Sequence, residues 1–172
     1  MPDIVREWKP LNPEEAIKAF IESEYPLRVF LCHSSKDKPT VRNLYRKLIS
    51  EGFNPWLDEE NILPGQDWRR AIESGVKQAE TILVCLSVQS LTKEGYVHEE
   101  IKRVLEITEK RTNNSIFLIP VRLEDCIVPE SLSRWQWVNL FDKRGYERLI
   151  QGLTERAKLI KLSHLREHLH KE

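Results

Sequence analysis

The chain has 172 residues, of which 31% are charged and 40% hydrophobic, and its 27 basic residues balance its 27 acidic residues. This length suits one ordinary domain with a real hydrophobic core, and the formal net charge of zero argues against recognition of nucleic acid or of an anionic membrane through a global field. No run approaches the ~18 apolar residues of a membrane span, and the N-terminus lacks the basic and apolar segments of a signal peptide.

The cysteines indicate a reducing compartment. Cys32, Cys85 and Cys126 are odd in number and widely spaced, and the first two lie in apolar runs, where a thiol usually acts as a small buried hydrophobic group. We therefore expect a soluble cytoplasmic protein.

Residues 1–26 form an N-terminal helical extension. Asn12 followed by Pro13 and two glutamates is a typical helix start, and Pro26 ends the segment. Such a short helix is not stable alone in water, so we expect it to pack against the main domain or against a second chain.

The next segments predict a strand–helix–strand unit. Residues 27–32 form an apolar strand, a polar loop follows, and a helix spans about 38–51, where Gly52 ends it. Strand character returns at 53–57, and residues 58–67 form a loop. Asp67 then caps another helix, which Gly75 weakens.

Residues 81–106 change their hydrophobic period in the middle. Residues 81–86 are apolar or β-branched almost without interruption, as in a strand that is covered on both faces. After a polar break the apolar residues follow a helical stripe from Val97 to Leu105. Glu100 lies at the margin of this stripe, and Tyr96 lies one turn before it. Ligands of open α/β sheets usually bind beyond the carboxyl ends of the strands, so Glu100 is the first candidate for chemistry.

The C-terminal third completes the alternation. Residues 115–123 predict a strand in which Pro120 requires an end, an edge or a bulge, and 135–141 predict a fifth strand whose Trp135 and Trp137 we expect in the core. Helical spacing then continues from residue 145, and 162–172 form a helical tail or linker. Alternating strands and helices predict a parallel five-stranded sheet with helices on both faces.

Four segments together resemble the Toll/interleukin-1 receptor (TIR) domain family. They are RVFLCHSSKD, WLDEENILPGQDW, LSVQSLTKEGYVHEEI and WQW, and they occur in the order and spacing of the family across residues 27–161. The resemblance implies a flavodoxin-like three-layer fold. It also implies one of two functions, either a protein–protein interaction module or an enzyme that cleaves NAD+ to nicotinamide and ADP-ribose or a cyclic variant.

The resemblance implies a catalytic role for Glu100, which stands in the aromatic-x-x-x-Glu pattern of the active members after Tyr96. The scissile nicotinamide–ribose bond resembles a glycosidic bond, but its leaving group already carries positive charge and departs neutral. One carboxylate that stabilises the oxocarbenium-like transition state is then enough, without a general acid. The alternative is an ordinary first-turn acid, and Glu99 is its natural control.

Other residues are candidates for binding NAD+ as substrate. Trp68 and Tyr96 could stack on nicotinamide or adenine, or they pack in the core or rim. The loop after the first strand could hold phosphate or ribose, or it serves only as a turn and a cap. This loop lacks the arginine of some active members, and Lys36 is the nearest substitute. The candidate substrate-binding residues are His33, Ser34, Ser35, Lys36, Gly65, Trp68 and Tyr96.

Three further patterns receive simpler interpretations. Asp58, Glu59 and Glu60 indicate a solvated acidic loop that moves over the site or contacts a neighbour, rather than a paired-carboxylate site. The histidines of the tail lack a further credible ligand, so no metal is expected. A phosphoreceiver domain is set aside because it needs acids at the end of the first strand.

The sequence therefore predicts an extension (1–26), a TIR domain (27–161) and a tail or linker (162–172). We expect an NAD+ glycohydrolase, or an ADP-ribosyl cyclase, that is activated by homotypic TIR–TIR self-association and acts in defence or cell-death signalling. NAD+ is the substrate, and neither a cofactor, nor nucleic acid, nor a membrane is expected as partner. The alternative is a non-catalytic TIR interaction module, and the trigger of assembly and the linear or cyclic product stay open.

Overall fold

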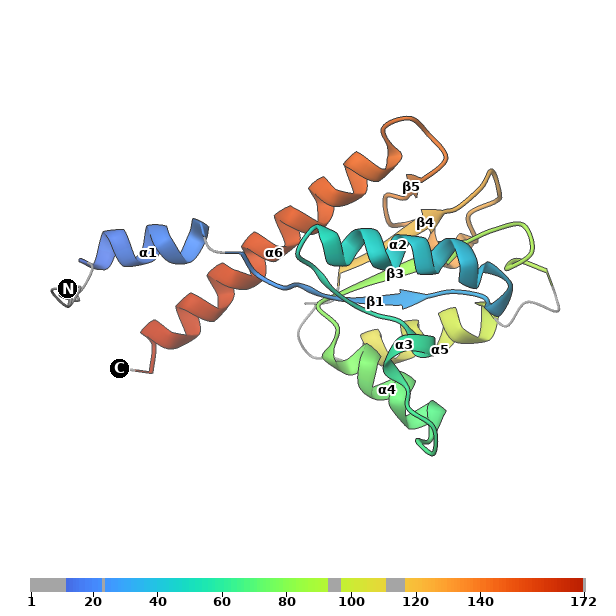
Figure 1. The fold of residues 1–172 in the computed structure, drawn as a ribbon, viewed down its shortest axis with the longest axis horizontal. Helices are drawn as coiled ribbons and strands as arrows, with labels where there is room; N and C mark the ends of the chain where they lie inside the picture. The colour runs from blue at the N-terminus through green and yellow to red at the C-terminus, as the bar shows by residue number, and fades with distance from the viewer. Residues whose placement is uncertain (1–11, 23, 93–96, 111–116, 172) are drawn as a thin grey trace, which may run out of the picture.

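The computed structural model describes residues 12–22, 24–92, 97–110 and 117–171, and its centre is a five-stranded parallel sheet (Figure 1). The strands lie in the order β2-β1-β3-β4-β5. This order confirms the predicted flavodoxin-like fold. The strands are β1 (Arg28–Cys32), β2 (Asn54–Trp56), β3 (Thr81–Leu86), β4 (Phe117–Arg122) and β5 (Val138–Asn139).

Helices cover both faces of the sheet, as Figure 1 shows. One face packs against α2 (Lys38–Ser50) and α6 (Gly145–Leu169), and the other packs against α4 (Trp68–Gln78) and α5 (Val97–Glu109). All six residues of β3 are buried, because alternate side chains enter the two cores. The uninterrupted apolar run of β3 is therefore explained by a strand covered on both sides.

Pro120 lies inside β4, which pairs with β3 over six residues. On the other side β5 pairs only with Val121 and Arg122, so β4 is an edge strand at Pro120. The carbonyl of Arg122 faces β5 and accepts from Leu140, and backbone alternation turns the nitrogen of Pro120 toward the same open side. The missing N–H therefore breaks no ladder bond, as the expected edge position requires.

The fifth strand differs most from its prediction. Only two residues of the expected segment 135–141 are in β5. Trp135 is half-buried and packs against the hydrophobic core between the sheet and the helices α4 and α5. Trp137 is 37% exposed, so the core position that was expected for Trp137 was wrong. A second difference lies in the loop 58–67, which begins with the single-turn helix α3 (Asp58–Asn61).

The N-terminal helix α1 (Pro13–Glu22) lies beside the C-terminal half of α6, and both project from the body of the domain (Figure 1). The connection after α1 is fixed by Glu80, a buried acid just before β3. Its carboxylate accepts from the Tyr25 hydroxyl at 2.6 Å, from the Arg28 backbone N–H at 3.0 Å and from the Arg28 guanidinium at 3.2 Å. Arg156 of α6 donates to the Glu80 carbonyl at 3.1 Å, so one residue joins the extension, the sheet and α6.

Helix α6 runs without a break through residue 161 to Leu169, so residues 162–169 continue the last helix of the domain. The division into three parts stays a prediction.

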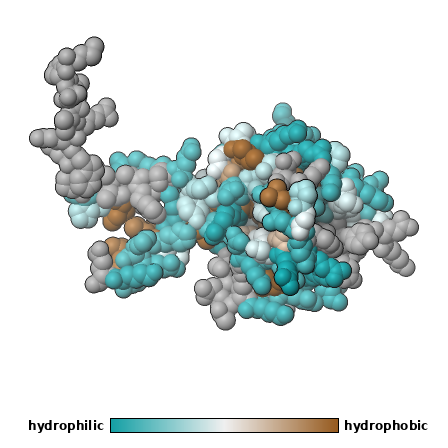
Figure 2. All heavy atoms as spheres, turned by 60° about the horizontal axis from the view of Figure 1, so that its bottom comes forward, coloured by the Kyte–Doolittle hydropathy of each residue, from teal (hydrophilic) through white to brown (hydrophobic). Residues whose placement is uncertain are grey.

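Figure 2 shows a largely hydrophilic face with small separate hydrophobic patches. Within the described ranges, every helix is too short or too polar to cross a bilayer.

Candidate functional site

A cavity of about 360 Å³ opens between α4 and α5 at the carboxyl end of β1. This is the place where ligands bind in open α/β sheets, and its volume falls near the lower end of the ~300–1,000 Å³ typical of small-molecule sites. Its floor is apolar and its rim carries charged side chains. The lining residues are Phe30, Leu31, Cys32, His33, Trp56, Asp58, Arg69, Ile72, Glu73, Val76, Arg103, Val104 and Ile107.

Two aromatic rings form one side of the floor. Phe30 of β1 and Trp56 of β2 stack with centroids 4.9 Å apart and planes 14° apart. Gly75 of α4 lies directly over them, and a Cβ at this position would be 3.1 Å from atoms of both rings. The glycine that weakens α4 as a helix therefore lets α4 lie close to the sheet.

His33 is the first polar residue of the rim and is only 7% exposed. Its Nδ1 lies 3.0 Å from the Leu31 carbonyl oxygen, so Nδ1 carries a proton and donates. Its Nε2 lies 3.7 Å from Asp58 Oδ1, and the other oxygen of Asp58 lies 3.9 Å from Lys38 Nζ. The ring is thus held between a backbone carbonyl and a carboxylate.

Asp58 corrects the expectation of a solvated acidic loop. Its side chain is one-third exposed, it lines the cavity, and it links the loop after β1 to the loop after β2. Asp58 follows the second strand as His33 follows the first, and the carboxyl ends of neighbouring parallel strands meet at one edge. That rule could have found the pair in the sequence. The side chains of Glu59 and Glu60 are not described.

The other residues of the first loop lie away from the cavity lining. Ser34 is buried and caps the short helix η1 (Ser35–Asp37), where its Oγ accepts from the Lys36 N–H at 3.4 Å. Ser35 and Lys36 are exposed on η1. Asp37 accepts a 2.8 Å hydrogen bond from the Ser87 hydroxyl, which fastens this loop to the exit of β3.

The Pro64–Gly65 turn has the geometry that its sequence predicts. Gly65 has φ of +87°, and the Gln66 N–H donates to the Leu63 carbonyl at 3.1 Å, which is a type II turn with proline and glycine in the middle. Apart from its chain neighbours, no atom of the described residues lies within 4 Å of a Cβ built on Gly65, so this position is open to solvent. It lies just before the Asp67 cap, which accepts from the N–H groups of Arg69 and Arg70 as predicted.

The remaining predicted residues are described only in part. Trp68 is the first residue of α4, and Glu100 lies in the first turn of α5, but their side chains are not described. Tyr96 lies outside the described residues. Position 100 precedes the lining residues Arg103 and Val104 by three and four positions, which is the spacing of one helix face. The backbone of α5 therefore places position 100 on the side of the cavity.

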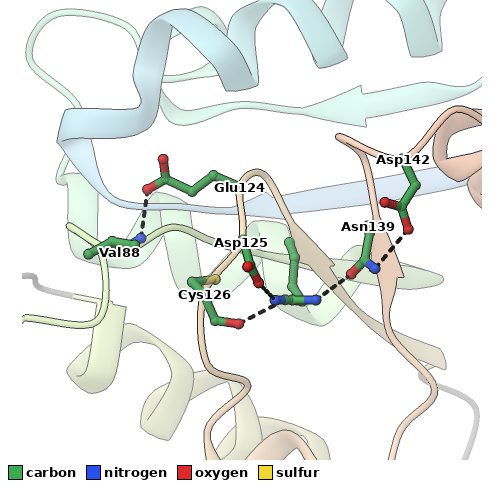
Figure 3. A network of polar contacts seen from close by, with 7 residues as sticks. Val88, Glu124, Asp125, Cys126, Asn139 and Asp142 are labelled. Atoms are coloured by element: carbon green, nitrogen blue, oxygen red, sulfur yellow. Dashed lines mark hydrogen bonds and ion pairs between the residues drawn. The ribbon is translucent and has the colours of Figure 1, made fainter.

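A polar network at the other half of the same edge was not found from the sequence (Figure 3). Arg122, at the end of β4, donates to the Cys126 carbonyl and to Asn139 Oδ1, both at 2.8 Å, and it pairs with Asp125. Glu124 accepts from the Val88 N–H at 2.8 Å. The network ties the exits of β3, β4 and β5 together and so fixes the start of the connection to α5.

Two of the three thiols, Cys85 and Cys126, are poorly suited to nucleophilic catalysis. Burial raises the pKa of Cys85 to about 12 and, to a lesser extent, raises the pKa of Cys126 above its usual value. No group of three metal-ligating side chains occurs among the described residues. The cavity lining itself offers carboxylates, aromatic rings, cationic side chains and the buried thiol of Cys32.

Comparisons with known proteins agree with this architecture. A sequence profile of the TIR domain family matches residues 29–153. The NAD(+) hydrolase TcpA of a Theionarchaea archaeon is 36% identical over 78 residues, which cover 45% of this chain and 24% of that protein. The 2' cyclic ADP-D-ribose synthase AbTIR of Acinetobacter baumannii is 33% identical over 115 residues, which cover 60% and 42% of the two chains. The chain thus spans less than half of these relatives.

Solved structures show the same fold at lower identity. The TIR domain of the Toll-related receptor TRR-2 from Hydra magnipapillata superposes with a TM-score of 0.59 at 19% identity, covering 72% of this chain and 95% of that one. The TIR domains of the activated Roq1 resistosome superpose with a TM-score of 0.50 at 18% identity, covering 83% and 99%.

Proposed function

Since the chain belongs to the TIR domain family, we propose that it cleaves the nicotinamide–ribose bond of NAD+ to give nicotinamide and ADP-ribose or a cyclic ADP-ribose. The observation that carries this proposal is the cavity between α4 and α5, whose α5 wall continues one turn back to Glu100. The names of the archaeal and Acinetobacter relatives, an NAD(+) hydrolase and a 2' cyclic ADP-D-ribose synthase, support it.

Glu100 is the proposed catalytic residue. As the bond to nicotinamide breaks, positive charge develops at C1′ of the ribose, and a carboxylate beside that carbon stabilises the charge. Nicotinamide departs as a neutral molecule, so no acid must protonate it. A water oxygen then bonds to C1′ and releases a proton to give ADP-ribose, or a hydroxyl of the same molecule does so to give the cyclic product. The first turn of a helix favours the ionised carboxylate, because the N–H groups there carry partial positive charge.

The aromatic and polar candidates would orient the substrate. Trp68 and Tyr96 are proposed to stack on the pyridinium or adenine ring, where a cation–π attraction favours the charged nicotinamide. His33, held by Leu31 and Asp58, is proposed to hydrogen-bond the ribose at the rim. Ser35, Lys36 and Gly65 are assigned to the outer part of the site, which a second molecule or a loop movement would complete. The buried Ser34 is assigned to positioning this loop, because its hydroxyl caps η1.

Self-association is part of the proposal. The resistosome neighbour contains TIR domains within an assembly, and the exposed Pro64–Gly65 turn is proposed to contact a neighbouring copy. Activity should therefore rise faster than linearly with protein concentration. A role in defence or cell-death signalling would follow from an activity that depletes NAD+ upon assembly.

The test is nicotinamide release, followed by chromatography over a range of protein concentrations. We expect release by the natural chain and a loss of at least ~100-fold in Glu100→Gln, which keeps the size of the side chain but removes its charge. Glu99→Gln is the matched control and should retain activity. Trp68→Ala should raise KM or abolish turnover without unfolding the domain.

Absence of nicotinamide release at every concentration, or release by Glu100→Gln equal to that of the natural chain, would contradict the proposed enzymatic activity. The first of these results, together with self-association in solution, would favour the non-catalytic interaction module instead.

A further inference from the structure

The second half of α6 carries leucines on a face that is open to solvent. Leu159, Leu162 and Leu169 are 60%, 39% and 61% exposed, and at ~100° per residue they fall on one stripe of the helix. The stripe lies after residue 153, where the match to the TIR family ends, and on the part of α6 that projects from the domain (Figure 1). An outer helix face is normally polar, so an apolar stripe there indicates an interaction surface.

The opposite side of α6 is already in use. Leu149, Leu153 and Ala157 attach this side of the helix to the sheet. Further along the same side, the His164 ring contacts the Tyr25 ring edge-on, with centroids 5.7 Å apart, so it faces the connection after α1. The exposed leucines therefore point away from both the sheet and this connection.

Two charges of opposite sign lie on the same stripe as the leucines. Glu155 and Arg166 are eleven residues apart, which is close to three helical turns, and two of the leucines lie between them. Glu155 pairs with Lys158 at 3.1 Å, but both side chains are more than half exposed, and such a pair contributes little. Arg166 is exposed and forms no ion pair within the described part of the chain. Both charges are thus available to a partner.

This pattern of acid, leucine, leucine and base is complementary to itself when two copies of α6 run antiparallel. If Leu159 lies opposite Leu162 of a second copy, Glu155 lies opposite Arg166 of that copy, and two-fold symmetry repeats both contacts. A parallel pair would set Arg166 opposite Arg166. An antiparallel pair centred on Leu162 would set Arg166 opposite Lys158, so like charges disfavour both of these alternatives.

We infer that the second half of α6 is a homodimerisation surface, on which Leu159 and Leu162 pack antiparallel against a second copy between two Glu155–Arg166 ion pairs. The two domain bodies then lie on opposite sides of the helix pair, because each body holds the other side of its own α6. A helix that binds an anionic membrane would carry basic residues beside its apolar face, and an acid on that face favours the second copy instead.

This surface is separate from the features of the proposed function. It lies neither at the cavity beside the carboxyl end of β1 nor at the Pro64–Gly65 turn, and it does not depend on cleavage of NAD+. A few leucines and two ion pairs make a small interface, so we expect a dissociation constant in the micromolar range.

Sedimentation velocity of the full chain between about 1 and about 200 µM measures the dimer. We expect Leu162→Glu to weaken dimerisation by at least ~10-fold, because it places a charge at the centre of the interface. Ile127→Glu is the matched control, since Ile127 is an exposed apolar residue outside α6, and it should dimerise as the natural chain does. Circular dichroism checks that each variant is folded.

A charge exchange tests the antiparallel register. Glu155→Arg alone sets two arginines against each other at both ends of the interface, and Arg166→Glu alone sets two glutamates there. Each variant should therefore dimerise at least ~10-fold more weakly than the natural chain. An equimolar mixture of the two variants restores opposite charges at both ends and should form a heterodimer of nearly natural affinity. Charges that serve only the folding of α6 would give no recovery on mixing.

Three results would overturn the inference: a natural chain that stays monomeric, a Leu162→Glu variant that associates as the natural chain does, or a mixture that dimerises no better than its components. Binding of the monomeric chain to phosphatidylserine vesicles, lost in Leu162→Glu, would overturn it in favour of a membrane surface. Nicotinamide release is scored separately. A dimer through α6 without release leaves the inference standing and contradicts the proposed function, and release by a chain whose association ignores Leu162→Glu does the reverse.

Discussion

Gly145 and Gly152, two glycines of α6, should respond oppositely to alanine. In a helix, alanine is favoured over glycine by about 0.5–1 kcal/mol, because glycine loses more backbone freedom on folding. At Gly152 the new Cβ would lie 3.8 Å from Ile119 Cδ1, which is ordinary van der Waals contact. We therefore expect Gly152→Ala to gain about 0.5–1 kcal/mol in the free energy of unfolding.

At Gly145 the new Cβ would penetrate the backbone of β5. It would overlap the Asn139 carbonyl oxygen and lie 2.7 Å from the carbonyl carbon and 3.1 Å from Leu140 Cα. Backbone cannot turn aside as a flexible side chain can, so either β5 or the first turn of α6 must shift. Overpacking costs about 1–3 kcal/mol, and the loss of a hydrogen bond around Asn139 adds about 1 kcal/mol. The net loss should be about 2–3 kcal/mol after the gain in helix propensity.

Urea and thermal unfolding, followed by circular dichroism, measure both variants. For a chain of this size 1 kcal/mol corresponds to roughly 2–4 °C in Tm, so Gly145→Ala should unfold about 4–12 °C lower and Gly152→Ala about 1–4 °C higher than the natural chain. A Gly145→Ala variant as stable as Gly152→Ala would refute the close approach of α6 to β5.

Two further predictions concern the polar networks. Burial and the hydrogen bond to Glu80 raise the pKa of Tyr25 to about 12 from 10.0. The contribution of Tyr25 to stability is therefore complete below pH 10 and is lost as the pH rises through about 12. The fall in unfolding free energy over this interval should be smaller in Tyr25→Phe, and an equal fall would contradict the hydrogen bond between Tyr25 and Glu80. Arg122→Lys should lower the free energy of unfolding in urea by about 2–3 kcal/mol, because an ammonium cannot reach both Cys126 and Asn139. The control Arg148→Lys, at an exposed position, should change it by less than ~0.5 kcal/mol, and equal effects would count against the network.

The sequence predicted best those elements whose pattern reflects burial on both sides. β3 begins and ends where its apolar run does, and Gly52 and Asp67 mark helix ends because backbone conformation and capping at these positions depend on local chemistry. β5 was predicted too long, because its aromatic residues are typical of strands, although β4 offers a partner only at Val121 and Arg122. The single turn α3 is too short to produce a helical period.

The candidate site was harder to predict than the fold. Arg69 and Arg103 look like ordinary solvated charges on two helices, and only the packing of α4 beside α5 brings them to one cavity. Gly75 illustrates the same limit. Propensity predicts only that it weakens α4, whereas the nearness of Phe30 and Trp56 is a property of three elements together.

The ends of the described chain lie on the side of the sheet opposite its carboxyl edge. In Figure 1, α1 and the last turns of α6 project together at one end of the molecule, while the strands point toward the other. At ~1.5 Å per residue α6 is about 37 Å long, against about 20 Å for the longest strands. A surface tether or a fluorescent protein joined after Leu169 would therefore sit on a stiff helical spacer and leave the cavity open to solution, which makes immobilised, concentrated arrays of this domain practical to assay.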